Sequence, residues 1–408
     1  MENKSYETYA RVYQGILRQA VKFLNWKPPL CLRGAGMLEI LPKTLKVRNY
    51  NKVLIVTDEG IRKAGLMDGL LDGLKSQGIE YFIYDGTVPN PTDENTVEAA
   101  AMFNAHQCDA IIGFGGGSPL DCAKGAAVMA EAGHENIRQY HGLLKVRRKL
   151  PPVIAVPTTA GTGSEGTIAT VITDTENKTK YAIMDPALRP EIVVLDATLT
   201  TGLPREITAH TGMDAVSHVV EAYINQSNTK ATRSMAEEAI RLIFQNLPEA
   251  YHNGKNKKAR DNMQYGAYLA GRTFTRGYVG NIHAMAHQIG AKYPVTHGEA
   301  NAVIMPYVLE EYGPVIHEDL ARLSDAAGIS EAGETVEEKA QAFISSIRDL
   351  NASLGIRETI LEIEEDDLDE MVDYSFAEAN PLYPVPVIFT KGKFRDMYLK
   401  VKNGPQSD

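Results

Sequence analysis

The sequence has few of the residues that would indicate an oxidising compartment or a nucleic-acid partner. Cysteine occurs three times in 408 residues, as Cys31, Cys108 and Cys122, and an odd, scattered set does not form a disulfide framework. Lysine and arginine number 42 against 52 acidic residues, a formal net charge of −10. Because no basic stripe is present, the chain does not match a protein that binds a phosphate backbone. The sequence therefore predicts a reducing compartment, the cytoplasm, and no nucleic-acid partner.

Long hydrophobic runs are also missing. No segment reaches the roughly 20 consecutive apolar residues that a membrane-spanning helix needs. The first residues, MENKSYETYARVYQ, lack the apolar stretch of a signal peptide. We therefore expect a cytoplasmic protein with no membrane partner. Because 408 residues exceed what one ordinary core accommodates, we also expect more than one domain.

Two kinds of secondary structure divide the chain near residue 200. Before that point, β-rich runs such as 52–56 alternate with helical patterns such as 59–75, which predicts a parallel sheet covered on both faces. The segment TENKTK at 175–180 has the composition of a hairpin turn. Beyond residue 200 the apolar spacing predicts seven to nine helices. We therefore expect a Rossmann-like α/β domain at 28–200 and an all-α domain at 201–408.

An amphipathic pattern precedes the first predicted domain. The apolar residues Tyr9, Tyr13 and Ile16 recur at helical spacing within residues 5–25. We therefore assign residues 1–27 to a helical extension. Its apolar face could pack against the body of the chain or against a neighbouring subunit, and the sequence leaves both arrangements open.

Four side chains in the second half of the chain have the types and spacing of one metal site. Asp214 and His218 stand four residues apart in TGMDAVSHVVEAY, which puts both on one face of a helix. His283 opens and His297 closes the segment HAMAHQIGAKYPVTH. A single helical histidine is typical of an ordinary core or surface. One carboxylate and three imidazoles together can hold Fe(II) or Zn(II) and leave a position open for a substrate oxygen. We therefore predict these four residues as ligands of one divalent metal ion.

Two glycine-rich loops follow buried strand patterns in the first domain. In DAIIGFGGGSPLDCAK, three glycines and Ser118 stand between a strand and a helix that begins near Pro119. Glycines let a backbone approach a pyrophosphate, which a helix N-terminus attracts. The second loop is PTTAGTGSE at 157–165. One glycine triplet alone is typical of a tight turn, but two such loops at the ends of parallel strands predict a dinucleotide site.

Asp58 ends the first strong strand pattern, in KVLIVTDEG. An acidic side chain at this place can accept hydrogen bonds from an adenosine ribose and repel the extra phosphate of NADP. We therefore expect NAD(H) as the cofactor. The alternative role of Asp58 is the N-cap of the helix that follows.

With these residues assembled, the chain resembles the iron-containing (group III) alcohol dehydrogenase family. The resemblance covers residues 28 to the C-terminus. It rests on motifs that occur in order: VTD at 56–58, NPT at 90–92, GGGSPLDCAK at 115–124, PTTAGTGSE at 157–165, GMDAVSHVVEAY, HAMAHQIGA and HGEANAVIMP. It implies a dinucleotide-binding α/β domain followed by a helical metal domain, with NAD(H) and Fe(II) as cofactors and Zn(II) as the alternative metal.

The resemblance also implies roles for individual residues. It gives the same four metal ligands. His287 becomes the candidate catalytic residue, which relays a proton to solvent; its rival role is to support a metal ligand. Phe274 and Phe376 fall where the family lines its substrate pocket. The implied cofactor contacts are Asp58, Asn90, Gly116, Gly117, Ser118, Asp121, Thr158, Thr159, Thr162 and Lys180.

These features predict a metal-dependent, NAD(H)-linked alcohol dehydrogenase or aldehyde reductase. We expect a short primary alcohol, aldehyde or diol as substrate, and the resemblance implies a homodimer or larger homo-oligomer. A lyase like dehydroquinate synthase is one alternative, but its anionic substrate requires several basic residues, and the metal segments supply few beyond Arg272, Arg276 and Lys292. A polyol or glycerol-type dehydrogenase of the same fold is the nearer alternative. A purely structural metal protein would not need two dinucleotide loops.

Overall fold

The chain forms two compact units. The computed structural model describes residues 2–21, 24, 26–133, 136–177 and 179–404. One unit, here the helical unit, comprises Met1–Leu24, Pro204–Asn253 and Arg272–Asp408. The other, here the sheet unit, comprises Asn25–Leu203 and Gly254–Gly271.

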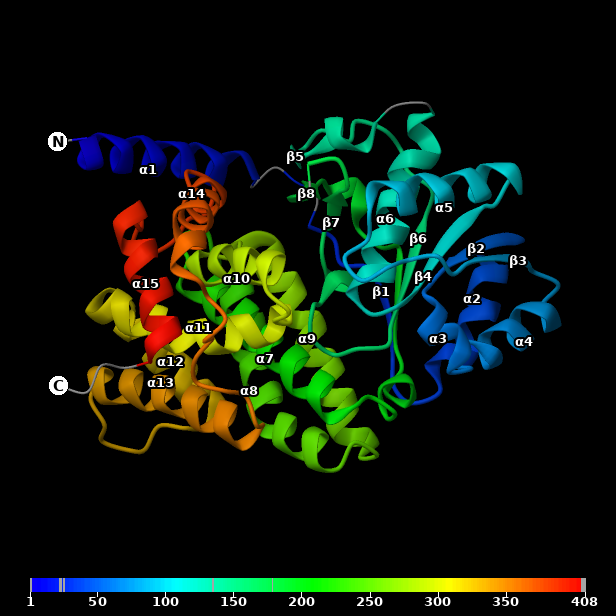
Figure 1. Cartoon of the computed structure of the whole chain (residues 1–408). Helices are drawn as coiled ribbons and strands as arrows, with labels where there is room; N and C mark the ends of the chain where they lie inside the picture. The colour runs from blue at the N-terminus through cyan, green and yellow to red at the C-terminus, as the bar shows by residue number, and fades with distance from the viewer. Residues whose placement is uncertain (1, 22–23, 25, 134–135, 178, 405–408) are drawn as a thin grey trace. The chain divides into compact units, whose positions relative to one another are not determined.

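A six-stranded parallel sheet organises the sheet unit (Figure 1). Its strand order is β1-β9-β6-β4-β2-β3, and every pairing is parallel. The two central strands β4 and β6 are buried along their whole length, which explains their continuous apolar sequences. The strands are β1 (Leu30–Arg33), β2 (Lys52–Val56), β3 (Glu80–Tyr84), β4 (Ala110–Gly115), β6 (Val153–Pro157) and β9 (Ile192–Leu195). The predicted Rossmann-like parallel sheet is confirmed.

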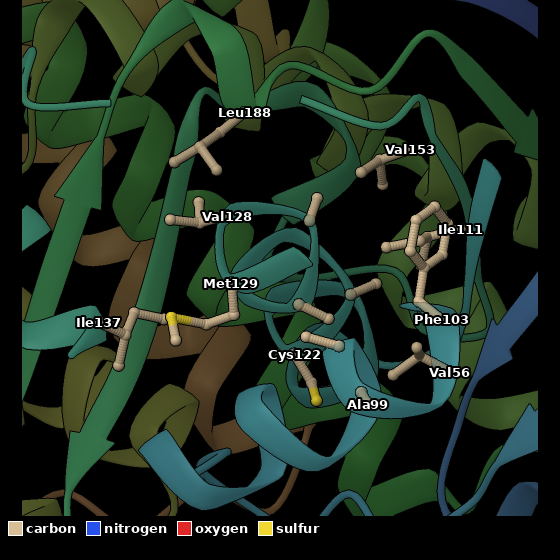
Figure 2. Packing of buried hydrophobic residues seen from close by; sticks show 14 of the residues in the cluster. Val56, Ala99, Phe103, Ile111, Cys122, Val128, Met129, Ile137, Val153 and Leu188 are labelled. Carbon is tan, nitrogen blue, oxygen red and sulfur yellow. The ribbon is translucent and has the colours of Figure 1, made fainter. Parts of the chain in front are cut away.

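Helices cover both faces of this sheet (Figure 1). On one face, residues such as Val56, Phe103 and Met129 form the apolar cluster of Figure 2. On the other face, Val53 and Ile55 join a second cluster, because successive residues of β2 point to opposite sides. Burying one such side chain stabilises the fold by roughly 1.5–3 kcal/mol. The α-helices of this unit are α2 (Leu41–Val47), α3 (Glu59–Lys63), α4 (Asp68–Ser76), α5 (Asp93–Ala105) and α6 (Gly117–Ala132), together with the part of α9 (Lys257–Gly277) that precedes Arg272.

A small second sheet lies in the same unit. Strands β7 (Ala169–Asp174) and β8 (Thr179–Met184) pair antiparallel, and β5 (Gly142–Leu143) joins β8 in parallel. This pairing confirms the hairpin predicted at 175–180. Short 3-10 helices η2 (Met37–Ile40), η3 (Ile137–Tyr140), η4 (Ser164–Gly166), η5 (Pro186–Leu188) and η6 (Ala197–Thr200) complete the connections of the unit.

Nine α-helices follow Pro204 in the part of the chain that the structure describes, in agreement with the seven to nine predicted. Helix α7 is buried from Gly212 to Ile224 and forms the centre of the helical unit. These helices are α7 (Arg205–Ile224), α8 (Lys230–His252), α9 (Lys257–Gly277), α10 (Asn281–Lys292), α11 (His297–Tyr312), α12 (His317–Ala327), α13 (Val336–Ser353), α14 (Leu368–Ala379) and α15 (Lys391–Asn403), with 3-10 helices η7 (Gly313–Ile316) and η8 (Glu365–Asp367). Among the described residues, none of the helices combines the length and the apolarity that crossing a bilayer demands.

The predicted N-terminal helix is present as α1 (Glu2–Ala20) and belongs to the helical unit. It runs beside α14 (Figure 1), where the ring of Tyr6 lies 5.4 Å from that of Phe376. Ala10 and Gln14 are buried on the packed side, whereas Tyr9 and Ile16 are exposed. Of the two arrangements that the sequence left open, α1 therefore packs on its own chain along one face.

Candidate active site

The four predicted metal ligands come together in the helical unit. Asp214 and His218 stand on successive turns of α7, His283 lies in the first turn of α10, and His297 is the first residue of α11. The Oδ1 atom of Asp214 lies 4.0 Å from Nε2 of His218, 3.9 Å from Nε2 of His283 and 3.4 Å from Nε2 of His297. We call these four residues the ligand group.

The ligand group fits a divalent transition metal. Donor atoms about 2 Å from one ion lie roughly 3–4 Å apart, and one atom from each of Asp214, His283 and His297 lies within 4.8 Å of the others. Burial lowers the pKa of His283 well below its ordinary value, and the neighbouring histidines add to this shift. Its imidazole is therefore neutral, which is the form that binds a metal.

A buried amide lies among the donor atoms of the ligand group. Asn301, one turn after His297 on α11, donates from Nδ2 to Oδ1 of Asp214 at 2.9 Å. The same nitrogen lies 3.1 Å from Nε2 of His297 and 3.3 Å from Nε2 of His283. The carboxylate oxygen and the two imidazole nitrogens therefore converge on one small region, as the donors of a bound cation do.

A buried carboxylate holds His283 from the side opposite Asp214. Glu221 is 1% exposed, and its Oε2 lies 2.6 Å from Nδ1 of His283. It also accepts the backbone N–H groups of Gly280 and Ile282 at the start of α10, at 2.8 and 2.7 Å. Burial raises the pKa of Glu221 to about 8. By engaging Nδ1, this carboxylate directs Nε2 toward the other donors and fixes the ring.

His287 lies beside the ligand group. Its ring stacks on that of His297, with the centroids 5.0 Å apart, and faces His283 edge-on at 6.0 Å. Its Nδ1 lies 2.7 Å from Oε1 of Glu378, and the hydroxyl of Tyr383 donates to the same oxygen at 3.0 Å. The side chain of His287 is 28% exposed, so it has the contact with solvent that a proton relay needs.

The two phenylalanines predicted to line the substrate pocket have different surroundings. Phe274 on α9 stacks on His218, with the ring centroids 4.3 Å apart. Phe376 on α14 contacts Tyr6 of α1. The structure thus brings Phe274 to the ligand group, whereas Phe376 packs against the N-terminal helix, and the pocket role of both residues stays a prediction.

Most of the predicted cofactor contacts lie at or near the C-terminal ends of strands of the parallel sheet. Asp58 follows β2, the glycines 116 and 117 follow β4, and Thr158 and Thr159 follow β6. Strand β2 stands between β3 and β4, so the winding direction of the sheet reverses between β2 and β4. A doubly wound sheet binds its ligand at such a point. The two glycine-rich loops touch there, since a Cβ on Gly117 would lie 2.9 Å from the methyl carbon of Thr162.

Three of these residues are joined by hydrogen bonds. Lys180 donates to the side-chain oxygen of Asn90 at 2.9 Å, and the backbone N–H of Asn90 donates to Oγ of Ser118 at 3.2 Å. The residues come from the loop after β3, the start of α6 and the hairpin strand β8. The hairpin and the first glycine loop are therefore brought to the same end of the sheet.

Two acidic residues of the predicted cofactor set already have structural roles. The carboxylate of Asp58 accepts the N–H of Ile61 at 2.9 Å and caps α3, so the alternative N-cap role is observed and the ribose contact stays a prediction. Asp121 accepts from Oγ of Ser164 at 2.7 Å and from the N–H of Val171 at 3.2 Å. Burial raises the pKa of this carboxyl.

A buried lysine joins the two glycine-rich loops. Lys124 on α6 has no exposed surface, and its ammonium donates to the carbonyl of Ser164 at 2.6 Å and to that of Ala169 at 2.7 Å. It also donates to the hydroxyls of Ser164 and Thr167, both at 2.9 Å. Burial lowers the pKa of Lys124 to about 8, and the surrounding oxygens offset part of this cost.

Sequence reasoning gave no role to Glu221, Glu378, Asn301 or Lys124. Glu221 follows His218 by three residues, so the spacing of Asp214, His218 and Glu221 on one helix face was a usable signal. Asn301, four residues after His297, carried a similar signal. Glu378 stands 91 residues from its partner His287, and no local pattern connects them.

Comparison with known proteins matches both parts of the chain to one family. Residues 28–197 match the iron-containing alcohol dehydrogenases, and residues 208–401 match the C-terminal region of the Fe-containing alcohol dehydrogenase family. The chain belongs to the iron-containing alcohol dehydrogenase family. It is an NAD-dependent alcohol oxidoreductase, and its family implies a metal ion and NAD(H) as cofactors.

Individual relatives agree with this assignment. The chain is 39% identical over 352 residues to the 1,3-propanediol dehydrogenase of Klebsiella pneumoniae, which covers 85% of this chain and 90% of the relative. It is 38% identical to alcohol dehydrogenase 4 of Schizosaccharomyces pombe, with 88% and 85% covered. A crystal structure of a 1,3-propanediol oxidoreductase matches with a TM-score of 0.88 at 36% identity, covering 93% of this chain and 100% of the other. These matches favour an alcohol dehydrogenase over the lyase alternative.

Proposed function

We propose that this protein interconverts short primary alcohols or diols and their aldehydes, using NAD(H) and one Fe(II) ion. The observation that carries the proposal is the convergence of Asp214, His218, His283 and His297, of which the first three are at most 5% exposed. The family description supports iron, although the same donors accept Zn(II). The relatives support the substrate class, since one is a 1,3-propanediol dehydrogenase and another, from Escherichia coli, a lactaldehyde reductase.

In this proposal the ligand group and the side chains around it have distinct tasks. A metal ion held by the ligand group supplies Lewis acidity toward the substrate oxygen. Glu221 keeps the ring of His283 in place through Nδ1. Because Nδ1 of His287 is held by Glu378, its Nε2 is the atom that exchanges a proton between the substrate side and solvent. Phe274 shields His218 from water by covering its ring.

The sheet unit is proposed to bind NAD(H). The pyrophosphate would lie at the N-terminus of α6, where Gly116 and Gly117 leave the backbone N–H groups open to it. Asp58 would accept from the adenosine ribose and disfavour NADP. The remaining proposed contacts are Asn90, Ser118, Asp121, Thr158, Thr159, Thr162 and Lys180.

The test is an assay of the full-length protein loaded with Fe(II) or, separately, with Zn(II). The panel contains ethanol, 1-propanol, 1,3-propanediol, glycerol and a secondary alcohol, and the absorbance of NADH is followed. We expect net NADH formation with the primary alcohols or the diol, and NADH consumption with the corresponding aldehydes. If neither direction changes NADH with any member of the panel, the proposal is wrong. Faster turnover of glycerol than of 1,3-propanediol would instead favour the polyol alternative.

A further inference from the structure

The N-terminal helix α1 precedes both segments that match the family, since the first begins at residue 28. It is nevertheless held firmly by the helical unit. The guanidinium of Arg11 donates two hydrogen bonds, at 2.7 and 2.9 Å, and the side-chain amide of Gln14 donates two more, at 3.0 and 2.8 Å. The four acceptors are the backbone carbonyls of Val385, Pro386, Pro381 and Tyr383. We call residues 381–386, between α14 and α15, the buttressed loop.

The side chains of α1 that contact the buttressed loop are themselves held in place. Gln14 is 6% exposed, and its Oε1 accepts a hydrogen bond from Arg11 at 3.0 Å, so the two side chains orient each other. Ala10, on the same side of α1, is fully buried. Backbone carbonyls that are removed from water need a donor, and α1 supplies one to each of four carbonyls in the buttressed loop. The path of the loop therefore depends in part on α1, beside the N–H of Gln226, which donates to the carbonyl of Pro384 at 2.8 Å.

The buttressed loop in turn contacts the proposed proton relay. Tyr383, whose carbonyl is held by Gln14, donates its hydroxyl to Oε1 of Glu378 at 3.0 Å. The same carboxylate oxygen lies 2.7 Å from Nδ1 of His287. Burial raises the pKa of the Tyr383 hydroxyl well above its ordinary value, so this group stays protonated and remains a donor. A continuous set of contacts thus leads from α1 to the imidazole beside the ligand group.

We infer that α1 is a positioning element for His287, acting through the buttressed loop, Tyr383 and Glu378. The inference rests on the proposed function as far as the role of His287 in turnover is concerned. The structural part, that α1 fixes the buttressed loop, stands independently of it. Arg11 and Gln14 are positioning residues in this sense, because their hydrogen bonds go to the loop carbonyls.

The first experiment compares two double variants of the full-length protein, each loaded with the same metal. Arg11→Ala/Gln14→Ala removes the four hydrogen bonds to the buttressed loop. Val12→Ala/Arg18→Ala is the matched control, because both side chains are exposed on the same helix. We expect the first variant to retain full metal content and an alcohol KM within about twofold of the wild type. Its kcat should fall about tenfold, which is less than the rate loss expected when a general acid–base group is removed altogether. The control should keep the wild-type kcat. An unchanged kcat in the first variant would overturn the inference.

A double-mutant cycle tests whether the effect passes through Tyr383. Tyr383→Phe removes only the hydroxyl that contacts Glu378. If α1 acts through this group, combining Tyr383→Phe with Arg11→Ala/Gln14→Ala slows turnover no more than the slower parent variant, because interacting sites are not additive. Losses of kcat that multiply would show that α1 acts by another route and would overturn the inference. Gln14→Met, which keeps the size and removes the amide donor, replaces the double variant if that variant does not fold.

Hydrogen exchange separates failure of this inference from failure of the proposed function, since it requires no turnover. We expect the amides of Leu382, Tyr383, Val385 and Val387 to exchange faster in Arg11→Ala/Gln14→Ala than in the wild type, with α10 and α11 unchanged. Equal protection of these amides would overturn the inference whatever the activity. A wild-type protein that fails the alcohol assay, together with faster exchange in the variant, would contradict the proposed function and support the positioning by α1.

Discussion

The helical unit and the sheet unit build their sites from different parts of the chain. In the helical unit, side chains from α7, α10 and α11 converge on one point, and buried polar groups hold them there. In the sheet unit, the proposed site is made largely of backbone at strand ends. Its side chains are already engaged there, since Asp121 accepts from Ser164 and Asn90 accepts from Lys180. A site made of converging side chains should fail when one of them is removed. A site made of backbone should bind its ligand more weakly when an added side chain fills the space beside it.

The largest expected effect comes from removing one donor of the ligand group. His283→Ala deletes a proposed metal ligand and leaves Glu221 buried without the imidazole that it contacts. We expect loss of the bound metal and a loss of turnover on the order of a thousandfold, since Lewis-acid stabilisation amounts to several kcal/mol. Metal analysis and NADH formation measure both effects. His252→Ala, at an exposed position in the same unit, should leave both unchanged. An active variant of His283 without metal would contradict the metal site.

The second-largest effect is expected from changing Glu221, whose carboxyl group contacts His283. Glu221→Gln keeps the size of the side chain and replaces the carboxyl group that engages Nδ1 with an amide. We expect metal affinity to fall by about 10- to 100-fold, measured by competition with a chelator. Glu206→Gln, at an exposed position in the first turn of the same helix, is the control and should bind metal as the wild type does. Equal affinity in the Glu221 variant would show that Glu221 serves only to anchor the start of α10.

A smaller effect is expected from filling the space between the two glycine-rich loops. Gly117→Ala places a Cβ 2.9 Å from the methyl carbon of Thr162, which forces the loops apart. We expect NADH to bind about tenfold more weakly, about 1.4 kcal/mol, while metal content stays normal. Cofactor titration by fluorescence measures the first effect.

Two variants test this explanation of the Gly117 effect. Gly69→Ala, at an exposed position of α4, adds a Cβ that meets no atom within 4 Å and should bind NADH normally. Thr162→Ser in the Gly117→Ala background removes the clashing methyl group and should restore part of the affinity. If Gly117→Ala loses metal but keeps its NADH affinity, the proposed division of tasks between the units is wrong.

The smallest effect is expected at Asp58, which has an observed role and a proposed one. Asp58→Asn retains an oxygen that can cap α3 but removes the charge, whereas Asp58→Gly removes both at a cost of only a few tenths of a kcal/mol. We expect both variants to raise the ratio of kcat/KM for NADP to that for NAD by a similar, roughly tenfold amount. A ratio unchanged in both variants would leave capping as the whole role of Asp58.

The sequence predicted those features whose cause is local. The closeness of Asp214 and His218 could be predicted because helical spacing places both on one face. The parallel sheet followed from the alternation of strands and helices. The single helical pattern at 59–75, however, is two helices in the structure, α3 and α4, because Gly65 between them adopts a φ of +67°, which an α-helix does not continue.

Features that depend on distant contacts were not predictable. Strand β1 is a run of four residues, Leu30–Arg33, and becomes a strand only by pairing with β9. Glu378 reaches His287 only when α14 packs on α10, and Tyr383 joins them from a loop held by α1. No spacing pattern in a single sequence indicates that these side chains are in contact.

The ammonium of Lys124 has a consequence for redesign of coenzyme preference. One cation is shared by α6, by η4 and by the start of β7, so these segments behave as one rigid block. Lengthening either glycine-rich loop by a residue would withdraw oxygens from a charge that has no access to water. Engineered changes to the proposed nucleotide site should therefore transfer both loops and Lys124 together.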